Sequence, residues 1–316
     1  MATDQTSEAR LYTEGPEGLR SEEMILNMGP QHPSTHGVLR LVLTLEGETV
    51  VHCTPVIGYL HRGIEKILEN RPYMGGIRYM DNSDYLSPML NETAYAGAVE
   101  QLMGIEPPRR AQYIRLLCNE LQRIASHLVA IGTYGLDLGA FTPILYTFRD
   151  REGIMDMFEA LGGSRFNVNY LRVGGVLHDF PAGWLQQCEQ WLDRFERMGL
   201  PELEELITGN EIFDARTQGV GYIDPRQAVA YGLTGPILRA SGVSFDLRVD
   251  RPYMAYREIP VNVQTRQEGD AFARYRVRMN EMYESVRLCR VVLDKLPGGA
   301  ISSRTPIALR PPRGET

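Results

Sequence analysis

The sequence predicts an α+β protein built around a central antiparallel helical bundle, with a β-hairpin region before it. Along two long segments, apolar residues recur every three or four positions, which is the period of a helix with one buried face. Between residues 38 and 60 they recur at every second position, which is the period of a strand. A Gly-rich stretch at about 209–262 leans toward β structure and is expected to interrupt the bundle.

The bulk composition is that of a soluble globular protein. The 316 residues are 43% apolar and 23% charged, enough for one large domain or two ordinary ones. The net charge of −7 argues against a binder of duplex nucleic acid, whose affinity comes from neutralising phosphates. No segment reaches the roughly 18–20 apolar residues of a membrane span.

The N-terminal part divides into two regions. Residues 1–23 are polar and acidic, lack the apolar core of a signal peptide, and are expected to form a flexible tail of a cytoplasmic protein. Residues 24–75 are expected to form a β-rich region. Its hairpin turns at Glu46-Gly47-Glu48, and its first strand carries the alternating residues Leu39, Leu41, Leu43 and Leu45.

Residues 76–296 are predicted to form the bundle. One apolar stripe consists of Ile114, Leu117, Leu121, Ile124, Leu128 and Ile131. The last helix begins after Asp270, a good N-cap, and ends at Pro297. Such spacing also suits a coiled coil, but further helical segments at about 143–161 and 181–207 favour an internal bundle.

The final residues, 297–316, are rich in Pro, Gly, Ser and Arg and are predicted to be irregular. They are expected to be either a flexible tail or the point at which a longer polypeptide has been cut short.

The four cysteines are Cys53, Cys118, Cys188 and Cys289, and no CxxC occurs. This spacing supplies neither a zinc ribbon nor a local iron–sulfur motif. Any redox centre that the protein uses is therefore expected to belong to another molecule.

The loop 29–37 is the first candidate site. It holds His32 and His36 between two prolines and two glycines, which predicts a rigid shape that is not helical. Histidine changes charge near neutral pH, so the loop suits proton chemistry or ligand binding. The alternative is a turn before a strand, in which the histidines only bond to backbone groups.

Three further clusters are candidates. Arg62 and Glu65 are spaced for an ion pair across one helical turn, which is more often structural than catalytic. Tyr85 lies just before a helix predicted to begin near Asn91, where the positive end of the helix dipole favours a developing anion. Tyr85 is thus a possible proton donor, or an ordinary boundary residue. Asp137 lies among apolar and glycine residues, and a carboxylate buried there would need a cation or a proton.

Several segments together resemble the NADH-quinone oxidoreductase (respiratory complex I) family of 49 kDa-type subunits, whose bacterial members are called the D subunit. They are GPQHPSTHGVLRL (29–41), IGYLHRGIEK (57–66), NELQRIASHL (119–128), LDLGA with the following TP (136–143) and GLTGPILRASG (232–242). The match runs from Met24 to Gly299 in family order. Members of this family normally continue further, so the chain is expected to be a fragment or naturally short.

This family is in turn similar to the large subunit of nickel–iron hydrogenases, which implies a hydrogenase-like fold. The counterparts of one hydrogenase CxxC pair are Asp84 and Ser87, and nickel needs thiolate ligands, so a nickel hydrogenase is disfavoured and no metal is expected. Arg62 and Glu65 match the hydrogenase arginine and glutamate near the metal and are expected to be structural or proton-linked.

The resemblance implies that the substrate is a quinone, bound in a cavity between this subunit and the small iron–sulfur subunit. His36 and Tyr85 match the two ligands of the quinone headgroup, and Asp137 matches the carboxylate coupled to the histidine. Thr133 aligns near the cavity wall. His32 is expected to stabilise the loop only.

The implied function is that of one subunit in a proton-pumping NADH:quinone oxidoreductase, a translocase active only within the complex. Protons for quinone reduction would come from His36 and Tyr85, and electrons from an iron–sulfur cluster in the partner, since this chain is expected to bind neither metal nor flavin. The alternative is an inactive, hydrogenase-like scaffold for assembly. The presence of His36, Tyr85 and Asp137 together favours the enzyme.

The implied partners are the other complex I subunits and quinone, but no nucleic acid. Chief among these subunits is the small B subunit, which carries the iron–sulfur cluster, followed by the C and I subunits and the H subunit in the membrane. The implied location is peripheral, on the cytoplasmic side of the cell inner membrane.

Overall fold

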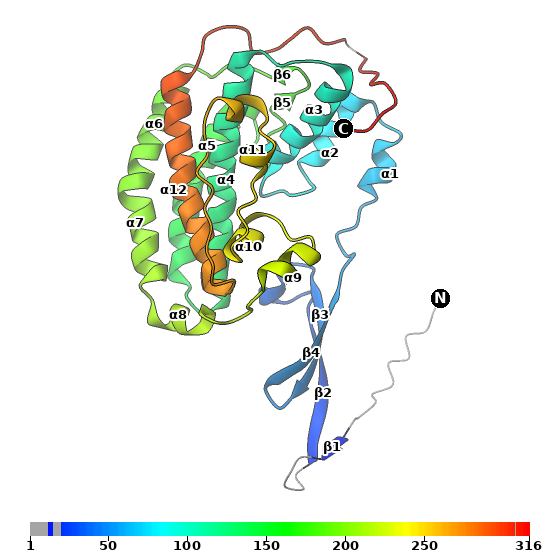
Figure 1. Ribbon diagram of the computed structural model, residues 1–316, viewed down its shortest axis with the longest axis vertical. Coiled ribbons are helices and arrows are strands. Elements are labelled where there is room, and N and C mark those ends of the chain that lie inside the picture. The colour runs from blue at the N-terminus through cyan, green and yellow to red at the C-terminus, as the bar shows by residue number, and fades with distance from the viewer. Residues whose placement is uncertain (1–11, 15–19, 307) are drawn as a thin grey trace. The chain divides into compact units, whose positions relative to one another are not determined.

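The computed structural model of the protein describes residues 12–14, 20–306 and 308–316 (Figure 1). The chain forms two compact units, residues 1–67 and 68–316, and each is described by itself.

The first unit is an antiparallel sheet with strand order β1-β2-β3-β4. The strands are β1 (Tyr12–Glu14), β2 (Arg20–Met28), β3 (Arg40–Glu46) and β4 (Thr49–Val56). The β3–β4 hairpin confirms the strands predicted within residues 38–60. Most of the predicted flexible tail, residues 1–23, lies outside the described residues, while β1 and the start of β2 fall within it. Strand β2 stays paired with β3 beyond its apolar residues, as far as Glu23. Backbone hydrogen bonds between the strands therefore extend the sheet into a polar part of the sequence.

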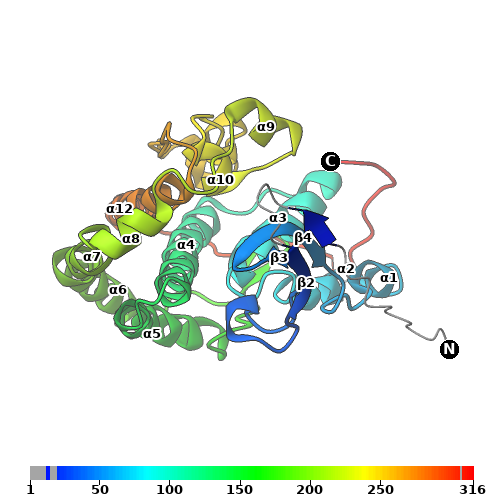
Figure 2. The same ribbon diagram turned by 90° about the horizontal axis from the view of Figure 1, so that it is seen from below.

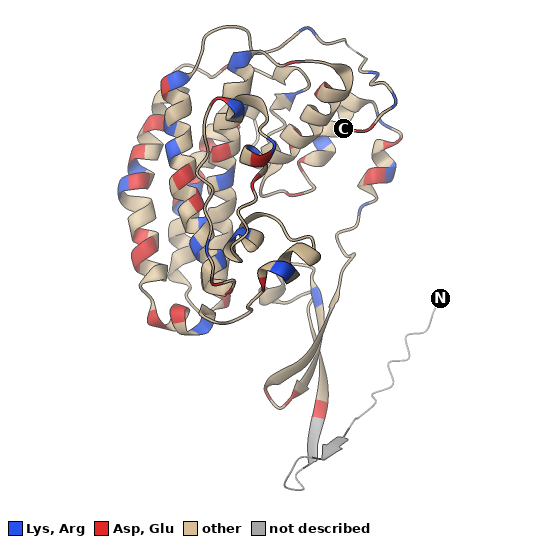
Figure 3. Cartoon of the chain, in the orientation of Figure 1, with Lys and Arg blue, Asp and Glu red and all other residues tan. Residues whose placement is uncertain are grey.

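The two faces of this sheet differ in polarity. Leu26 of β2 lies opposite Leu43 of β3, which in turn lies opposite Cys53 of β4, so these side chains share one apolar face. Leu43 is buried, whereas Met24 is 52% exposed and Leu26 is 41% exposed. The apolar face of the hairpin is therefore only partly covered within this chain. Figure 3 shows few charged residues along the hairpin.

The second unit begins within α1 (Ile64–Leu68) and continues through α2 (Tyr73–Met80) and α3 (Pro88–Met103). Its bundle consists of α4 (Arg109–Asp137), α5 (Thr142–Gly162), a helical stretch from Trp184 to Thr208, and α12 (Ala271–Lys295). The stretch contains α6 (Trp184–Arg194) and α7 (Leu200–Leu203), each followed by a short π-helical segment. Figures 1 and 2 show these helices side by side.

The bundle confirms the helical periodicity of the sequence. The connection between α4 and α5 is short, as expected for antiparallel neighbours. The six residues of the predicted stripe on α4, Ile114 to Ile131, are at most 1% exposed. Of the cysteines, Cys118, Cys188 and Cys289 are buried as free thiols, where they act as small apolar side chains.

The stretch 209–262 contains no strand, and its predicted β character is wrong. It forms short helices: α8 (Glu211–Thr217), α9 (Pro225–Ala230), α10 (Gly235–Ala240), α11 (Leu247–Asp250) and the 3₁₀ turn η4 (Met254–Arg257). The side chains of Asn210, Asp224 and Asp246 accept bonds from the first backbone N–H groups of three of these helices. These N-caps stabilise the starts of helices in a segment whose glycine content suggested strands.

A second, two-stranded sheet pairs β5 (Leu171–Arg172) with β6 (Gly175–Val176). The irregular segment from 297 is anchored beside it, because the backbone N–H of Ser303 donates to the carbonyl of Gly174 at 2.9 Å. Leu309 is also buried, in a small cluster with Ile77 and Val99. Mixed helices and small antiparallel sheets confirm the α+β class, while the likeness to hydrogenases stays a prediction. Within the described ranges, no helix is both long and apolar enough to cross a membrane.

Candidate functional site

The loop 29–37 is held by its own hydrogen bonds. The ring Nδ1 of His32 accepts from the backbone N–H of Ser34 at 3.1 Å and so caps the 3₁₀ turn η1 (Pro33–Thr35). The buried Thr35 hydroxyl donates to the carbonyl of His32 at 2.9 Å. Gly29 has φ of +87°, and a Cβ there would lie 2.1 Å from the carbonyl oxygen of Leu39, so only glycine fits. The expected structural role of His32 agrees with its cap.

His36 ends this turn with a left-handed backbone, φ 49° and ψ 39°. A residue other than glycine rarely takes this conformation, and it persists only where the surrounding loop imposes it. The imidazole is exposed within this chain. The loop therefore fixes the backbone of His36 and leaves its ring accessible.

Tyr85 lies in the turn between α2 and α3, and the backbone on either side of it is fixed. The Asp84 carboxylate accepts from the backbone N–H of Leu86 at 3.0 Å. The carbonyl of Leu86 accepts from the side-chain amide of Gln122 on α4 at 2.7 Å. The Tyr85 side chain is 53% exposed, and among the described residues its hydroxyl has no hydrogen-bond partner. The helix that follows begins at Pro88, three residues earlier than predicted.

Asp137 is the last residue of α4 and is exposed, so the expectation of a buried carboxylate is corrected. The C-terminal end of a helix carries partial negative charge, which disfavours a carboxylate and favours a nearby cation. Arg216 of α8 supplies a guanidinium at this helix end, where its Nη1 donates to the carbonyl of Leu138 at 2.5 Å. Sequence reasoning missed Arg216, because 78 residues separate it from Leu138 and no local pattern marks the pairing.

Thr133 lies one turn before Asp137 and is half-buried. Its hydroxyl donates to the carbonyl of Val129 within the same helix, at 2.8 Å. The hydroxyl is thus already paired, and a ligand would meet mainly its methyl group or its oxygen lone pairs.

The predicted ion pair between Arg62 and Glu65 is not formed in the part of the chain that the structure describes, and both side chains are exposed. Gly63 has φ of +64°, so the backbone turns and α1 starts only at Ile64. Arg62 therefore lies outside the helix, and the two residues do not face each other across a helical turn.

The predicted site residues belong to both units. His36, Arg62 and Glu65 lie in the first unit, whereas Tyr85, Thr133 and Asp137 lie in the second. The bond from Gln122 places the Tyr85 turn beside the middle of α4, about 22 Å along the helix axis from Asp137.

A buried network of charges, which the sequence did not reveal, surrounds Glu120 on α4. The carboxylate accepts from Arg248 at 3.1 Å, from Arg123 at 3.3 Å, from the Ser285 hydroxyl at 2.6 Å and from the Tyr256 hydroxyl. Burial alone would raise the pKa of Glu120, but the two arginines and the hydroxyl donors hold that pKa at about 2.

The network extends along α4. Arg239 donates to Glu281 of α12 at 2.6 Å, and Glu281 accepts from His127 of α4 at 2.7 Å. Against the effect of burial, His127 and Arg239 keep the pKa of Glu281 well below its usual range. These buried pairs fix the position of α4 relative to α10 and α12. The sequence contains one local sign of this network, because the charged residue Glu120 lies directly before Leu121 of the apolar stripe.

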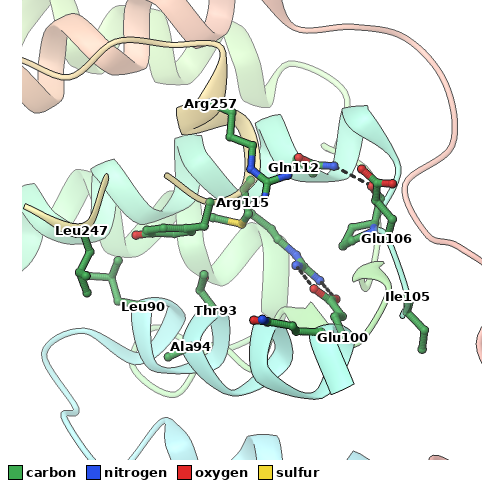
Figure 4. Close-up of a pocket in the computed structure, with 15 residues that line it drawn as sticks. Leu90, Thr93, Ala94, Glu100, Ile105, Glu106, Gln112, Arg115, Leu247 and Arg257 are labelled. Carbon is green, nitrogen blue, oxygen red and sulfur yellow. Dashed lines mark hydrogen bonds and ion pairs between the residues drawn. The ribbon is translucent and has the colours of Figure 1, made fainter. Parts of the chain in front are cut away.

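A cavity of about 690 Å³ lies between α3, α4 and the segment 247–257 (Figure 4). The buried ion pair of Arg115 with Glu100, at 2.6 Å, forms part of its wall. None of Tyr85, Thr133 and Asp137 lies among its lining residues. Across the described ranges, no group of three or more His, Cys, Asp or Glu side chains is arranged to hold a metal ion.

Comparison with known proteins supports the resemblance. Residues 137–316 match the family described as the 49 Kd subunit of the respiratory-chain NADH dehydrogenase. The D subunit of the NADH-quinone oxidoreductase of Desulforamulus reducens is 50% identical over 297 residues, which cover 94% of this chain and 81% of the relative. The D subunit of the Clostridium beijerinckii enzyme is 48% identical over 94% of this chain and 80% of its own length.

A chloroplast relative extends the comparison beyond bacteria. The chloroplastic H subunit of the NAD(P)H-quinone oxidoreductase of Zea mays is 50% identical over 280 residues, covering 89% of this chain and 71% of the relative. Identity at this level over nearly the whole chain shows common descent. This chain therefore belongs to the family of the 49 kDa subunit of the respiratory-chain NADH dehydrogenase.

Proposed function

We propose that this chain, as part of complex I, forms part of the site at which quinone is reduced, with Tyr85 and His36 as the proton donors. The observation that carries the proposal is the geometry around Tyr85. Its backbone is fixed on both sides, while its hydroxyl is exposed and without a partner among the described residues. A general acid needs this combination of fixed position and free hydrogen-bonding capacity.

Reduction of a quinone to a quinol takes two electrons and two protons. The electrons would come from an iron–sulfur cluster in the partner small subunit, and the protons would go to the two carbonyl oxygens. The Tyr85 hydroxyl would donate to one oxygen and the His36 imidazolium to the other. The N-terminal end of α3, next to Tyr85, would stabilise negative charge as it develops on the oxygen.

Asp137 is proposed to couple to His36 and to favour its protonated form. The partners that complete the cavity would be the small iron–sulfur subunit and the C, I and H subunits, with this chain peripheral to the membrane. Thr133 would contribute to the wall, and Arg62 and Glu65, both exposed in this chain, would be structural or proton-linked.

Photo-cross-linking of the purified complex tests the site. An azidoquinone analogue is expected to label peptides that contain residues 29–37 and 82–87, and excess short-chain quinone should suppress the labelling. Labelling confined to other subunits would refute the proposed site and would leave the scaffold function as the explanation for this chain.

Replacing Asp137 by asparagine should shift the pH dependence of quinone reduction. Because the carboxylate is proposed to couple to His36, its loss should change the shape of the pH–rate profile. The measurement is the pH–rate profile of the assembled complex. Asp294→Asn is the matched control, since Asp294 is an exposed carboxylate in the last turn of α12. An identical profile for Asp137→Asn and wild type contradicts the coupling.

A further inference from the structure

A pair of buried carboxyl groups lies on either side of Tyr85 in the sequence. Asp81 caps the C-terminus of α2 and is 1% exposed, and Glu92 lies in the second turn of α3 and is fully buried. Each side chain is close enough to the other to shift its pKa, and each keeps one buried oxygen without a hydrogen-bond partner. A contact between two carboxyl groups requires a proton on one of them, because ionised carboxylates only accept.

The remaining hydrogen bonds of the pair agree with one shared proton. Oε2 of Glu92 accepts from the backbone N–H groups of Tyr170 at 3.1 Å and Leu171 at 2.6 Å. The oxygens left without a donor are Oδ1 of Asp81 and Oε1 of Glu92, one from each carboxyl. A proton between the two carboxyls gives these buried oxygens a hydrogen-bond partner, and leaving them without one would cost free energy.

Two arginines lie near the pair and favour its ionised form, but among the described residues neither forms an ion pair with it. In the part of the chain that the structure describes, the charged or titratable groups facing the pair are Arg78 from α2, Arg172 from β5 and the buried thiol of Cys118 from α4. None of the described ion pairs joins either arginine to Asp81 or Glu92, and Arg172 donates instead to the carbonyls of Asn169 and Leu171.

Burial accordingly raises the pKa of Glu92 well above its usual range, and the neighbouring Asp81 raises it further. Burial also raises the pKa of Asp81. A group whose pKa is raised on folding keeps its proton in the folded state, and the stabilisation is lost as the pH rises through the folded value. The pair is therefore expected to open as the pH rises through that value.

We propose that Asp81 and Glu92 share one proton, and that this proton ties α2 to α3 and so positions the turn that presents Tyr85. The pair thus positions the proposed proton donor, and this inference rests on the proposed function of Tyr85. When the proton is lost, two buried carboxylates repel each other, and the turn between them loosens.

Glu92→Gln separates this role from simple packing. The glutamine oxygen still accepts from Tyr170 and Leu171, and its amide N–H donates to the ionised Asp81, so the variant mimics the protonated pair at every pH. In the wild-type complex, turnover should fall about tenfold for each pH unit by which the pH exceeds the value at which the pair loses its proton. In Glu92→Gln the part of this decline that the pair causes should be absent, so that only the decline due to the proton donors themselves remains. Glu106→Gln, an exposed carboxylate just beyond α3, should keep the wild-type profile.

Hydrogen exchange of the same complexes tests the shared proton without using quinone chemistry. Protection of the amides at 82–87 and 169–171 should fall in wild type as the pH rises above the ionisation of the pair, and should stay constant in Glu92→Gln. If Tyr85 is not the proton donor, the exchange result still holds while the turnover profiles no longer differ. That outcome refutes the positioning role and leaves the shared proton intact.

Equal loss of protection in wild type and Glu92→Gln overturns the shared proton. Asp81→Asn is the second variant, since its amide can donate to an ionised Glu92. Failure of both amide variants to assemble at neutral pH would also contradict the proposal, because a shared proton makes each amide a close mimic of the native pair.

Discussion

Replacing Tyr85 by phenylalanine should lower quinone-dependent turnover of the assembled complex by about 10²–10⁴-fold, the usual contribution of a positioned general acid. Phenylalanine keeps the ring and removes only the hydroxyl. Because this side chain is 53% exposed and its hydroxyl bonds to nothing in the described part of the chain, assembly and thermal stability should stay within about 0.5 kcal/mol of wild type.

The measurement is steady-state turnover with a short-chain quinone, with kcat and KM determined separately. A loss in kcat indicates a role in the transition state, whereas a change in KM alone indicates a role in binding. Tyr231→Phe is the matched control, since Tyr231 is a 78% exposed tyrosine of the same unit. Normal turnover in an assembled Tyr85→Phe complex would exclude this residue as the proton donor.

Replacing Glu120 by glutamine should give the largest loss of stability. Arg123 and Arg248 both pair with this buried carboxylate, although Arg248 also pairs with Asp246 at 2.7 Å, and removing one partner of a buried ion pair costs about 3–5 kcal/mol. At roughly 2–4 °C per kcal/mol, the melting temperature of the full chain should fall by about 6–20 °C.

Glu196→Gln is the control for Glu120→Gln, because it makes the same chemical change in an exposed ion pair with Arg290 and should cost less than about 1 kcal/mol. A second measurement uses pH. The pKa of Glu120 is lowered from 4.5 to about 2, so its stabilisation is present above pH 4.5 and is lost as the pH falls toward 2. The gap in melting temperature between wild type and Glu120→Gln should therefore narrow over this range. A constant gap, or one no larger than that of Glu196→Gln, contradicts the assigned role.

The bundle could be predicted from the sequence because its signal is local. The stripe on α4 repeats over several turns, and each apolar residue reports the same buried face. The stretch 209–262 was misread because its glycines suggested strands, whereas three side-chain caps, at Asn210, Asp224 and Asp246, start helices too short to show a period.

Single residues of the candidate site could be predicted from the sequence, but the contacts between residues could not. The rigid loop around His32 follows from its prolines and glycines, and the structure adds the hydrogen bonds. The pairing of Glu92 with Asp81, and of Glu120 with Arg248, brings together residues from separate elements. Single-sequence patterns contain no information about such pairs. A charged residue within or beside an apolar helical stripe is the one local sign that a buried partner exists.

The buried charges of α4 also have a mechanical consequence. Asp137 is about 25 Å along the helix axis from Glu120, yet both belong to one continuous helix. A side chain extends about 5–6 Å from the axis, so a rotation of α4 by about 20° would displace the Asp137 carboxylate by roughly 2 Å. A misplacement of about 1 Å can reduce a reaction rate by about 10²-fold. The ion pairs around Glu120 therefore set the angular alignment of a carboxylate that they never touch.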